Sequence, residues 1–467
     1  MEKKIVAIHP RLVPVLDRKF RPAILEYRAF LKAVADSNQA VPFRIALERS
    51  NGWISVYETS IFADNSELAE SNYFYVERLV KTLLWQKGGW RIICGGSPKV
   101  GKYLQKIYAP GGLRDFDIRF MSRVYERPFV VEITDYDRVP AANETSQPIG
   151  RNLEGCRIGF DAGGSDRKVS AVIDGKAVYS EEVVWFPKVQ TNPDYHYQEI
   201  LTAIQKASAM MPRVDAIGVS AAGIYINNRV MAASLFMKVP EDMFEKKVKD
   251  IFLRIQKVMG EVPMEVVNDG DVTALAGAID LNETRILGIS MGTSEAGGYI
   301  DNQGNITGWL NELAFIPVDF NPEATIDEWS GDYGCGVKYF SQDAVIKLAT
   351  VVGIDFMELL SPAEKLKLLQ ELLIDGDLRV KQIFETLGVY LGYGLAYYAE
   401  FYDIGHVLIL GRVTSGEGGN LILKSANEVL TVEFPELAAK LTLHLPDESS
   451  RRVGQAIAAA SLPNIKC

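Results

Sequence analysis

Small, hydroxyl and acidic residues follow several apolar segments of this 467-residue sequence. The first segment, Ile158–Phe160, leads into Asp161, a glycine pair at Gly163 and Gly164, and Ser165. Glycines let backbone N–H groups approach an anion closely. A carboxylate at a strand end can hold a hydrated cation. The pattern is compatible with an anion site and a hydrated cation, although alone it is also typical of an ordinary turn.

A second segment of the same kind covers residues 286–291 and leads into Gly292, Thr293 and Ser294. Either loop alone could be a hairpin turn. Two such loops, about 130 residues apart, can close on one polyphosphate from opposite sides.

Polar residues also follow the apolar segment Val262–Val267. They are Asn268, Asp269 and Asp271, and a helical pattern comes after them. Carboxylates at the carboxyl end of a sheet strand lie where α/β active sites form. Asp269 could then accept a proton from a substrate hydroxyl. The alternative is that one of these residues only caps the helix.

A further buried strand, Val407–Leu410, ends in Gly411, and the helix predicted before it, Phe384–Tyr402, carries several glycines. Small residues at helical spacing allow close packing of a second backbone or of a flat ligand. A helix–helix contact accounts for the same spacing.

The elements that position these residues fall on either side of a polar stretch, Pro140–Gly155, which predicts a domain boundary near residue 150. The first part has an α/β pattern. Its predicted helices are Pro22–Asp36 and Glu67–Lys87, and its predicted strands are Phe43–Glu48, Trp53–Thr59, Trp90–Cys94, Phe116–Arg123 and Pro128–Thr134. The second part begins in the same order. Its predicted strands are Cys156–Asp161, Lys168–Ile173, Val178–Val184 and Val214–Val219, with a helix at Tyr197–Met210.

Strand, hairpin, helix and strand therefore occur twice, with Arg44 aligned on Arg157. The similarity is compatible with a degenerate internal repeat and with a pattern common to many α/β proteins. The stretch Gly96–Tyr103 approaches a P-loop motif, but Tyr103 stands where the motif needs Ser or Thr. It predicts a turn that leads into a helix.

Composition limits the chemistry further. Four His and four Cys, without metal-ligand spacing, exclude a structural zinc site and a disulfide scaffold. Residues 1–150 carry a net charge of +5 and the remainder −15, which is compatible with chance or with a separate partner for the first part. The sequence has no membrane span and no signal peptide at its start, so we expect a cytoplasmic protein.

The order of these motifs, over residues 156–463, resembles the ROK family of sugar kinases and their relatives on the actin-like ATPase fold. IGFDAGGSDRK resembles its first phosphate motif, with Ser165 where Thr is usual, and GISMGTSEAGGYI its second. EVVNDGDVTALAGA resembles the segment with the catalytic Asp, and LILGRVTSGEGGNLIL the adenosine motif. VSAAGIYINNRV resembles a turn around Gly223, and DESSRRVGQAIAAA the closing helix.

The resemblance implies a two-lobed α/β fold of the actin-like (ribonuclease H-like) type, after a smaller α/β domain at 1–150. Lobe one would comprise about 151–270 with the C-terminal helix, and lobe two about 271–447. ATP and Mg²⁺ would be the cofactors. Their implied ligands are Asp161 for the metal, and Gly163, Gly164, Ser165, Gly292, Thr293, Ser294 and Gly411 for the nucleotide. Asn268 and Glu312 would bind the acceptor.

The sequence also departs from the family on the acceptor side. Phe315 replaces the His of the Glu-x-Gly-His stretch, whereas Glu312 is kept. The zinc loop, Ser330–Gly336, keeps one cysteine, Cys335, so zinc is not expected. Ser234–Phe236 resembles the Asn-Leu stretch with which members of the family usually contact the sugar. The part before the boundary does not resemble the winged helix of the family's repressors.

We therefore expect an ATP-dependent kinase that acts on a hydroxyl of a sugar or a similar small molecule, with Asp269 as the base. A homodimer is the candidate assembly, and we expect neither a membrane nor a nucleic-acid partner. The alternative is a non-catalytic sensor of ATP or sugar that uses its N-terminal domain for partner contacts. Other actin-like ATPases are a third class.

Overall fold

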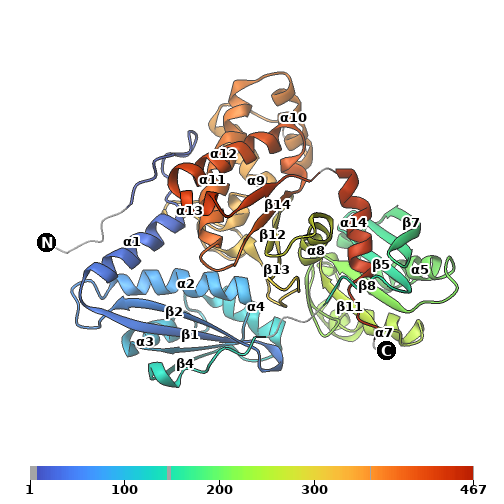
Figure 1. Cartoon of the computed structure of the whole chain (residues 1–467), viewed down its shortest axis with the longest axis horizontal. Coiled ribbons are helices and arrows are strands. Elements are labelled where there is room, and N and C mark those ends of the chain that lie inside the picture. Colours follow the sequence, from blue (N-terminus) through green and yellow to red (C-terminus); the bar gives the residue numbers. More distant parts are fainter. Residues whose placement is uncertain (1–7, 145–148, 358, 447, 466–467) are drawn as a thin grey trace.

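The computed structural model describes residues 8–144, 149–357, 359–446 and 448–465. The molecule has three parts, which Figure 1 shows at the lower left (blue), at the top (orange to red) and at the right (green). Residues 8–144, here called the N-terminal part, form one side. A first lobe with a five-stranded sheet and a second lobe with a four-stranded sheet form the others. Within the described residues, no helix is long and apolar enough to cross a membrane.

The N-terminal part has a four-stranded sheet in the order β2-β1-β3-β4. Its strands are β1 (Ala40–Glu48), β2 (Ile54–Phe62), β3 (Arg91–Gly95) and β4 (Val130–Thr134). Its helices are α1 (Ala23–Asp36), α2 (Ser71–Lys87), α3 (Pro98–Ile107) and α4 (Asp115–Tyr125). Helix α3 begins where Ser97 accepts a hydrogen bond from the Val100 N–H at 3.1 Å, so the Gly96–Tyr103 stretch is the predicted turn into a helix.

The sequence prediction for the N-terminal part is wrong in one element and in its symmetry. Phe116–Arg123 was expected to be a strand and lies in helix α4. The proposed repeat is also wrong, because β1 pairs with β3 antiparallel, whereas the aligned strands of the first lobe run parallel. A copied half-fold would preserve strand direction, which the crossover connections fix.

The first lobe has the strand order β11-β8-β5-β6-β7. The strands are β5 (Cys156–Ala162), β6 (Asp166–Ile173), β7 (Lys176–Val184), β8 (Ala216–Ala221) and β11 (Met264–Asn268). A hairpin of β9 (Ile224–Ile226) and β10 (Arg229–Ala232) follows β8. The helices are α5 (Pro193–Ser208), α6 (Glu241–Met243), α7 (Ile251–Val258) and, from the end of the chain, α14 (Glu448–Ala460). Gly159 and Gly218 let the backbone of α14 approach the sheet.

The second lobe has the strand order β13-β12-β14-β15. The strands are β12 (Ile286–Met291), β13 (Glu295–Ile300), β14 (His406–Leu410) and β15 (Thr442–His444). Its helices are α8 (Asp269–Leu281), α9 (Gln342–Val351), α10 (Pro362–Ile374), α11 (Leu378–Tyr398), α12 (Glu417–Glu433) and α13 (Pro435–Ala438). Helix α8 packs on this sheet and on α14, between the lobes (Figure 1).

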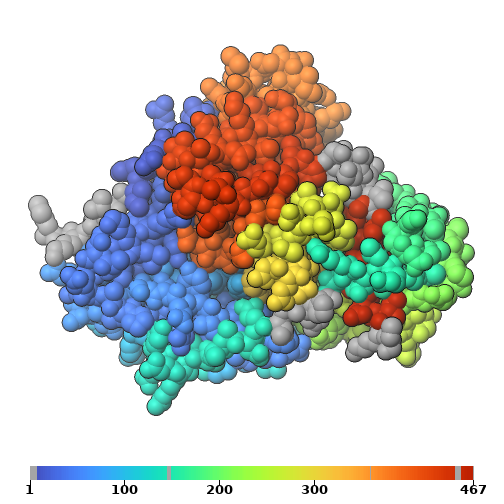
Figure 2. All heavy atoms as spheres, viewed as in Figure 1, coloured from blue at the N-terminus to red at the C-terminus, as the bar shows by residue number. Residues whose placement is uncertain are grey.

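The N-terminal part and the second lobe share one hydrophobic core. Phe20 packs on Tyr390 with the ring centroids 4.7 Å apart, and Tyr27 packs on Tyr397 at 6.0 Å. Figure 2 shows the atoms of the N-terminal part (blue) directly against those of the second lobe (orange to red). The first lobe has a separate core. The predicted linker is irregular where it is described, and residues 145–148 lie outside the described residues.

Candidate active site

Asp161 lies at the carboxyl edge of the first lobe's sheet. Because β5, β8 and β11 are parallel, their carboxyl ends meet at this edge, where Asp161 is level with Ser220. The residue is 7% exposed, and its carboxylate accepts a hydrogen bond from the Ser220 hydroxyl at 2.7 Å. Burial raises its pKa above the ordinary value, while the Ser220 bond and the Lys168 charge oppose this shift.

Asn268 and Asp269 divide two roles at the start of α8. Asn268 is the N-cap, because its side-chain oxygen accepts a hydrogen bond from the Gly270 N–H at 2.7 Å. Its amide nitrogen donates to the Gly223 carbonyl at 2.8 Å. Asp269 also accepts from the Gly270 N–H, at the longer distance of 3.1 Å, so the two side chains share this donor and Asn268 makes the shorter cap bond. Burial, together with the Asp161 charge, raises the pKa of Asp269 to about 6, close to the value that suits a general base at neutral pH.

The first glycine loop joins β5 to β6 and exposes Gly164 and Ser165 to solvent. Two lysines that the sequence analysis missed lie beside it. Lys168 pairs with Asp161 across the hairpin and lies 3.9 Å from its carboxylate. Lys188 is so near that a Cβ on Gly164 would lie 2.9 Å from its Nζ. The spacing of the β5–β6 hairpin could have predicted that Lys168 lies opposite Asp161. No local sequence pattern predicts that Lys188 lies beside this loop.

The second glycine loop joins β12 to β13 and exposes Thr293 and Ser294. The carbonyl of Gly292 accepts a hydrogen bond from the Gln342 N–H at 2.8 Å, which fixes this end of the loop. Gly411 lies at the same edge of this sheet, since β12 and β14 are parallel. Its φ of 99° and its contact with the Met291 backbone admit only glycine.

A cavity of about 670 Å³ lies between the lobes. This volume is within the usual range for small-molecule sites. Asp269 and Gly411 both line the cavity. Its wall also includes Gly270, Thr273, Ser290, Leu445 and Gln455. The exposed tips of the two glycine loops do not line it.

A smaller cavity of about 200 Å³ lies on the other side of Asn268 and includes Asp271. The three parts of the molecule all contribute to its wall. From the N-terminal part come residues 49–51, Trp53 and Tyr125; from the lobes come residues 223–227, 265–268 and 306–310. Burial raises the pKa of its carboxyl groups, Glu265 and Asp271, to about 7 in each case.

Glu312 and Phe315 follow this second cavity along the chain, and they have different surroundings. Burial, with the charges of Asp269 and Asp271, raises the pKa of Glu312 to about 7, which places its carboxyl group near the base. Phe315 instead packs against the N-terminal part, with its ring centroid 4.2 Å from that of Trp85. Phe315 therefore belongs to an aromatic contact between the N-terminal part and the second lobe.

The donor set suits magnesium and does not suit zinc. Asp161 offers one carboxylate, and Mg²⁺ in nucleotide sites is typically held by one or two carboxylates and the phosphates. In the described residues, no group of three His, Cys, Asp or Glu side chains could hold a metal on its own. In the loop Ser330–Gly336, Cys335 is the one cysteine and is buried, and burial raises the pKa of its thiol to about 12.

Comparison with solved structures identifies the fold. The ROK hexokinase from Thermus thermophilus matches with a TM-score of 0.51 at 18% identity, over 65% of this chain and 97% of that one. A ROK family transcriptional regulator, a homologue of the E. coli MLC protein, matches with a TM-score of 0.53 at 18% identity, over 66% and 79%. No protein-family model and no curated protein matches the sequence. About two thirds of this chain therefore has the ROK fold, a two-lobed architecture of the actin-like ATPase type, and the remaining third is additional to it.

Proposed function

We propose that the protein transfers the γ-phosphoryl group of ATP to a hydroxyl of a sugar or a sugar-like small molecule. One observation carries the proposal: Asp269, with a pKa of about 6, borders the cavity between the lobes, while Asn268 makes the shorter cap bond. The ROK hexokinase from Thermus thermophilus, which has the same fold, is a sugar kinase by name.

In this proposal Asp269 accepts the proton of the acceptor hydroxyl while that oxygen bonds to the γ-phosphorus. The bond from the γ-phosphorus to the bridging oxygen breaks, and ADP leaves. Such a transfer needs mainly alignment and charge neutralisation. Asn268 and Glu312 would orient the acceptor, and Gly411 would border the adenosine.

The two glycine loops would hold the phosphates with the residues predicted from the sequence: Gly163, Gly164, Ser165, Gly292, Thr293 and Ser294. Lys168 and Lys188 add cationic side chains beside the first loop. The cleft would have to close around the nucleotide, because the loop tips lie outside the cavity. Mg²⁺, held by Asp161 and the phosphates, would neutralise charge on the transferred group.

The direct test is Asp269→Asn, which keeps the shape of the side chain and removes the base. We expect ADP release, measured over a panel of sugars, to fall by about 10²–10⁴-fold. ATP binding, measured by calorimetry, should persist. Asp375→Asn is the matched control, since Asp375 is exposed at the end of α10. Unchanged turnover in Asp269→Asn would contradict the assignment.

A sensor without catalysis is the second candidate. Two observations favour it: a transcriptional regulator shares the fold, and Phe315 is committed to the contact with Trp85. The same sugar panel separates the candidates. ATP that binds without stimulation of ADP release by any sugar would favour the sensor.

A further inference from the structure

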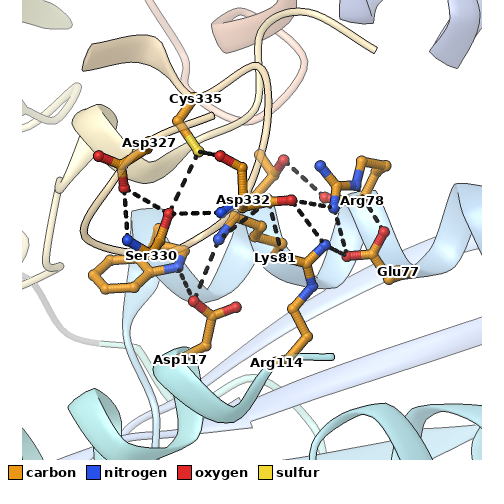
Figure 3. A network of polar contacts seen from close by, with 11 residues as sticks. Glu77, Arg78, Lys81, Arg114, Asp117, Asp327, Ser330, Asp332 and Cys335 are labelled. Atoms are coloured by element: carbon orange, nitrogen blue, oxygen red, sulfur yellow. Dashed lines mark hydrogen bonds and ion pairs between the residues drawn. The ribbon is translucent and has the colours of Figure 1, made fainter. Parts of the chain in front are cut away.

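A buried network of charged side chains joins the N-terminal part to the loop Asp327–Gly336, called here the clamped loop. Figure 3 shows the network, with Asp332 of the clamped loop at its centre. Helix α2 supplies Glu77, Arg78 and Lys81, and the start of α4 supplies Arg114 and Asp117. The six charged side chains are each 6% exposed or less.

Three cations contact the Asp332 carboxylate. Arg114 lies 2.8 Å from one carboxylate oxygen, and Lys81 lies 3.4 Å from the same oxygen. Arg78 lies 3.1 Å from the other oxygen. The clamped loop itself adds hydrogen bonds, in which Ser330 donates to Asp327 at 2.6 Å and contacts the Cys335 sulfur at 3.9 Å.

Each cation of the network has an acidic partner. Arg78 and Arg114 both pair with Glu77, and Lys81 lies 3.3 Å from Asp117. Three cationic side chains therefore face three carboxyl groups, although burial raises the pKa of Glu77 to about 7 and the pKa of Asp117 above its ordinary value. Burial alone would lower the pKa of Lys81, but the charges of Asp117 and Asp332 outweigh this and raise it above the ordinary value. The lysine is therefore a cation inside the protein.

We infer that Arg78, Lys81 and Arg114 take the place of a loop-ordering zinc ion, so that the N-terminal part holds the clamped loop without a metal. A zinc ion stabilises a loop by placing positive charge among its ligands. Here the positive charge comes from α2 and α4, which are distant from the loop in the sequence. Cys335, the one cysteine of the clamped loop, is buried, and its sulfur lies 3.9 Å from the Ser330 hydroxyl oxygen.

The clamped loop in turn contacts the segment that follows Glu312. The Val318 N–H donates to the Gly334 carbonyl at 2.8 Å, and the Gly336 N–H donates to the Ile316 carbonyl at 2.9 Å. Both bonds fix the segment that follows Glu312. Asp332 is therefore a positioning residue for this segment, and this part of the inference rests on the proposed function.

The first test concerns the metal and uses the unmodified full-length protein. We expect less than roughly 0.1 zinc per chain by elemental analysis, against one per chain for a structural site. EDTA should leave the melting temperature and the amide exchange of residues 327–336 unchanged. Stoichiometric zinc, together with loss of protection in EDTA, would overturn the inference.

The second test concerns charge and uses amide hydrogen exchange. Lys81→Met keeps the side-chain length and leaves the network with one excess negative charge. We expect exchange in residues 327–336 and 312–318 to become about tenfold faster, since unpaired buried charge destabilises its surroundings. The strand β8 should be unaffected. Lys32→Met, at an exposed lysine of α1, is the control.

The decisive variant is the double change Lys81→Met with Asp117→Asn, which restores charge balance. Protection should return to within about threefold of the original protein if charge is what matters. A double variant no better than the single one would show a packing role and overturn the inference. If Lys81→Met is insoluble, Asp332→Asn, which keeps the side-chain shape and leaves one excess positive charge, replaces it with the same expected increase in exchange, and Lys81→Met with Asp332→Asn is then the balanced double variant. These readouts do not use catalytic activity, so failure of the proposed function would leave them unchanged.

Discussion

At the scale of single residues, buried carboxyl groups are the main features of the site. Asp269, Asp271 and Glu312 all have raised pKa values because burial disfavours their charged forms. The local pattern of acidic residues after a strand indicated the segment Asn268–Asp271, and the resemblance then pointed to Asp269, whose role stays a prediction. The same pattern could not show that Asn268 makes the shorter cap bond, since that depends on side-chain geometry.

The raised pKa of Asp269 predicts the pH dependence of the proposed reaction. A general base acts in its deprotonated form, so kcat/KM should rise with pH through about 6 and reach a plateau above it. Initial rates at saturating ATP, between pH 4.5 and 8, measure this. A plateau that already extends below pH 5 would show that no buried base controls the reaction.

Glu295 predicts a pH dependence of stability. It is buried beneath the second glycine loop, and burial raises its pKa to about 8 in the folded protein. The unfolded chain releases this proton near pH 4.5, so the free energy of unfolding should fall as the pH rises from 4.5 to 8. Glu295→Gln removes this penalty. We expect the variant to gain on the order of 1–3 kcal/mol at pH 8 and little at pH 5.

Urea unfolding of Glu295→Gln at the two pH values is the measurement. Gln can still accept the hydrogen bond that the Tyr398 hydroxyl donates at 3.1 Å. Glu428→Gln, at an exposed position of α12, should show no such difference between the pH values. An equal effect of Glu295→Gln at both values would contradict a buried neutral carboxyl.

At the scale of elements, the contact of α14 with the first lobe's sheet predicts a stability effect. A Cβ on Gly218 would overlap the Ala459 carbonyl oxygen of α14. We expect Gly218→Ala to destabilise the protein by about 1–3 kcal/mol, because backbone must move to admit the methyl group. Thermal unfolding measures this. Gly454→Ala, on the same helix but in open space, should be neutral or slightly stabilising.

Local pattern predicted most strands and helices and was wrong where one segment contains two periods. Phe116, Ile118 and Phe120 alternate with polar residues, which indicated a strand. In the structure Asp117 is buried, where it accepts hydrogen bonds from Lys81 and from the Trp85 indole at 3.0 Å. Both partners belong to helix α2. The buried residues of α4, which include Ile118, Met121 and Val124, recur at helical spacing, so the sequence contained both periods and the contact with α2 accompanies the helical one.

At the scale of the whole molecule, the shared core predicts that residues 1–149 cannot be removed. A fragment of residues 150–467 would expose the surfaces that contact Phe20 and Tyr27, and would leave Asp332 without its cations. We expect this fragment to aggregate or to lack a cooperative unfolding transition. Size-exclusion chromatography and calorimetry test this. Co-expression with residues 1–149 should recover soluble protein, and a stable monomeric fragment would contradict the expectation.

The sequence predicted the order of the two lobes but not how the N-terminal part sits on them. The boundary near residue 150 is a change in composition, whereas the packing of α1 on α11 joins residues far apart in the sequence. The opposite net charges of the two parts fit this arrangement. Arg28 of α1 pairs with Glu400 at 3.0 Å and with Glu436 at 3.1 Å.

The Asp332 contacts also have a consequence for synthesis on the ribosome. The N-terminal part emerges first, and Arg78 and Arg114 must wait for the second lobe to supply the carboxylate that pairs with both. Until then the network has three cations and two carboxylates, with an excess positive charge beside Lys81. We therefore expect the nascent N-terminal part to reach its final packing only after the second lobe has been translated, because unpaired buried charge destabilises its surroundings.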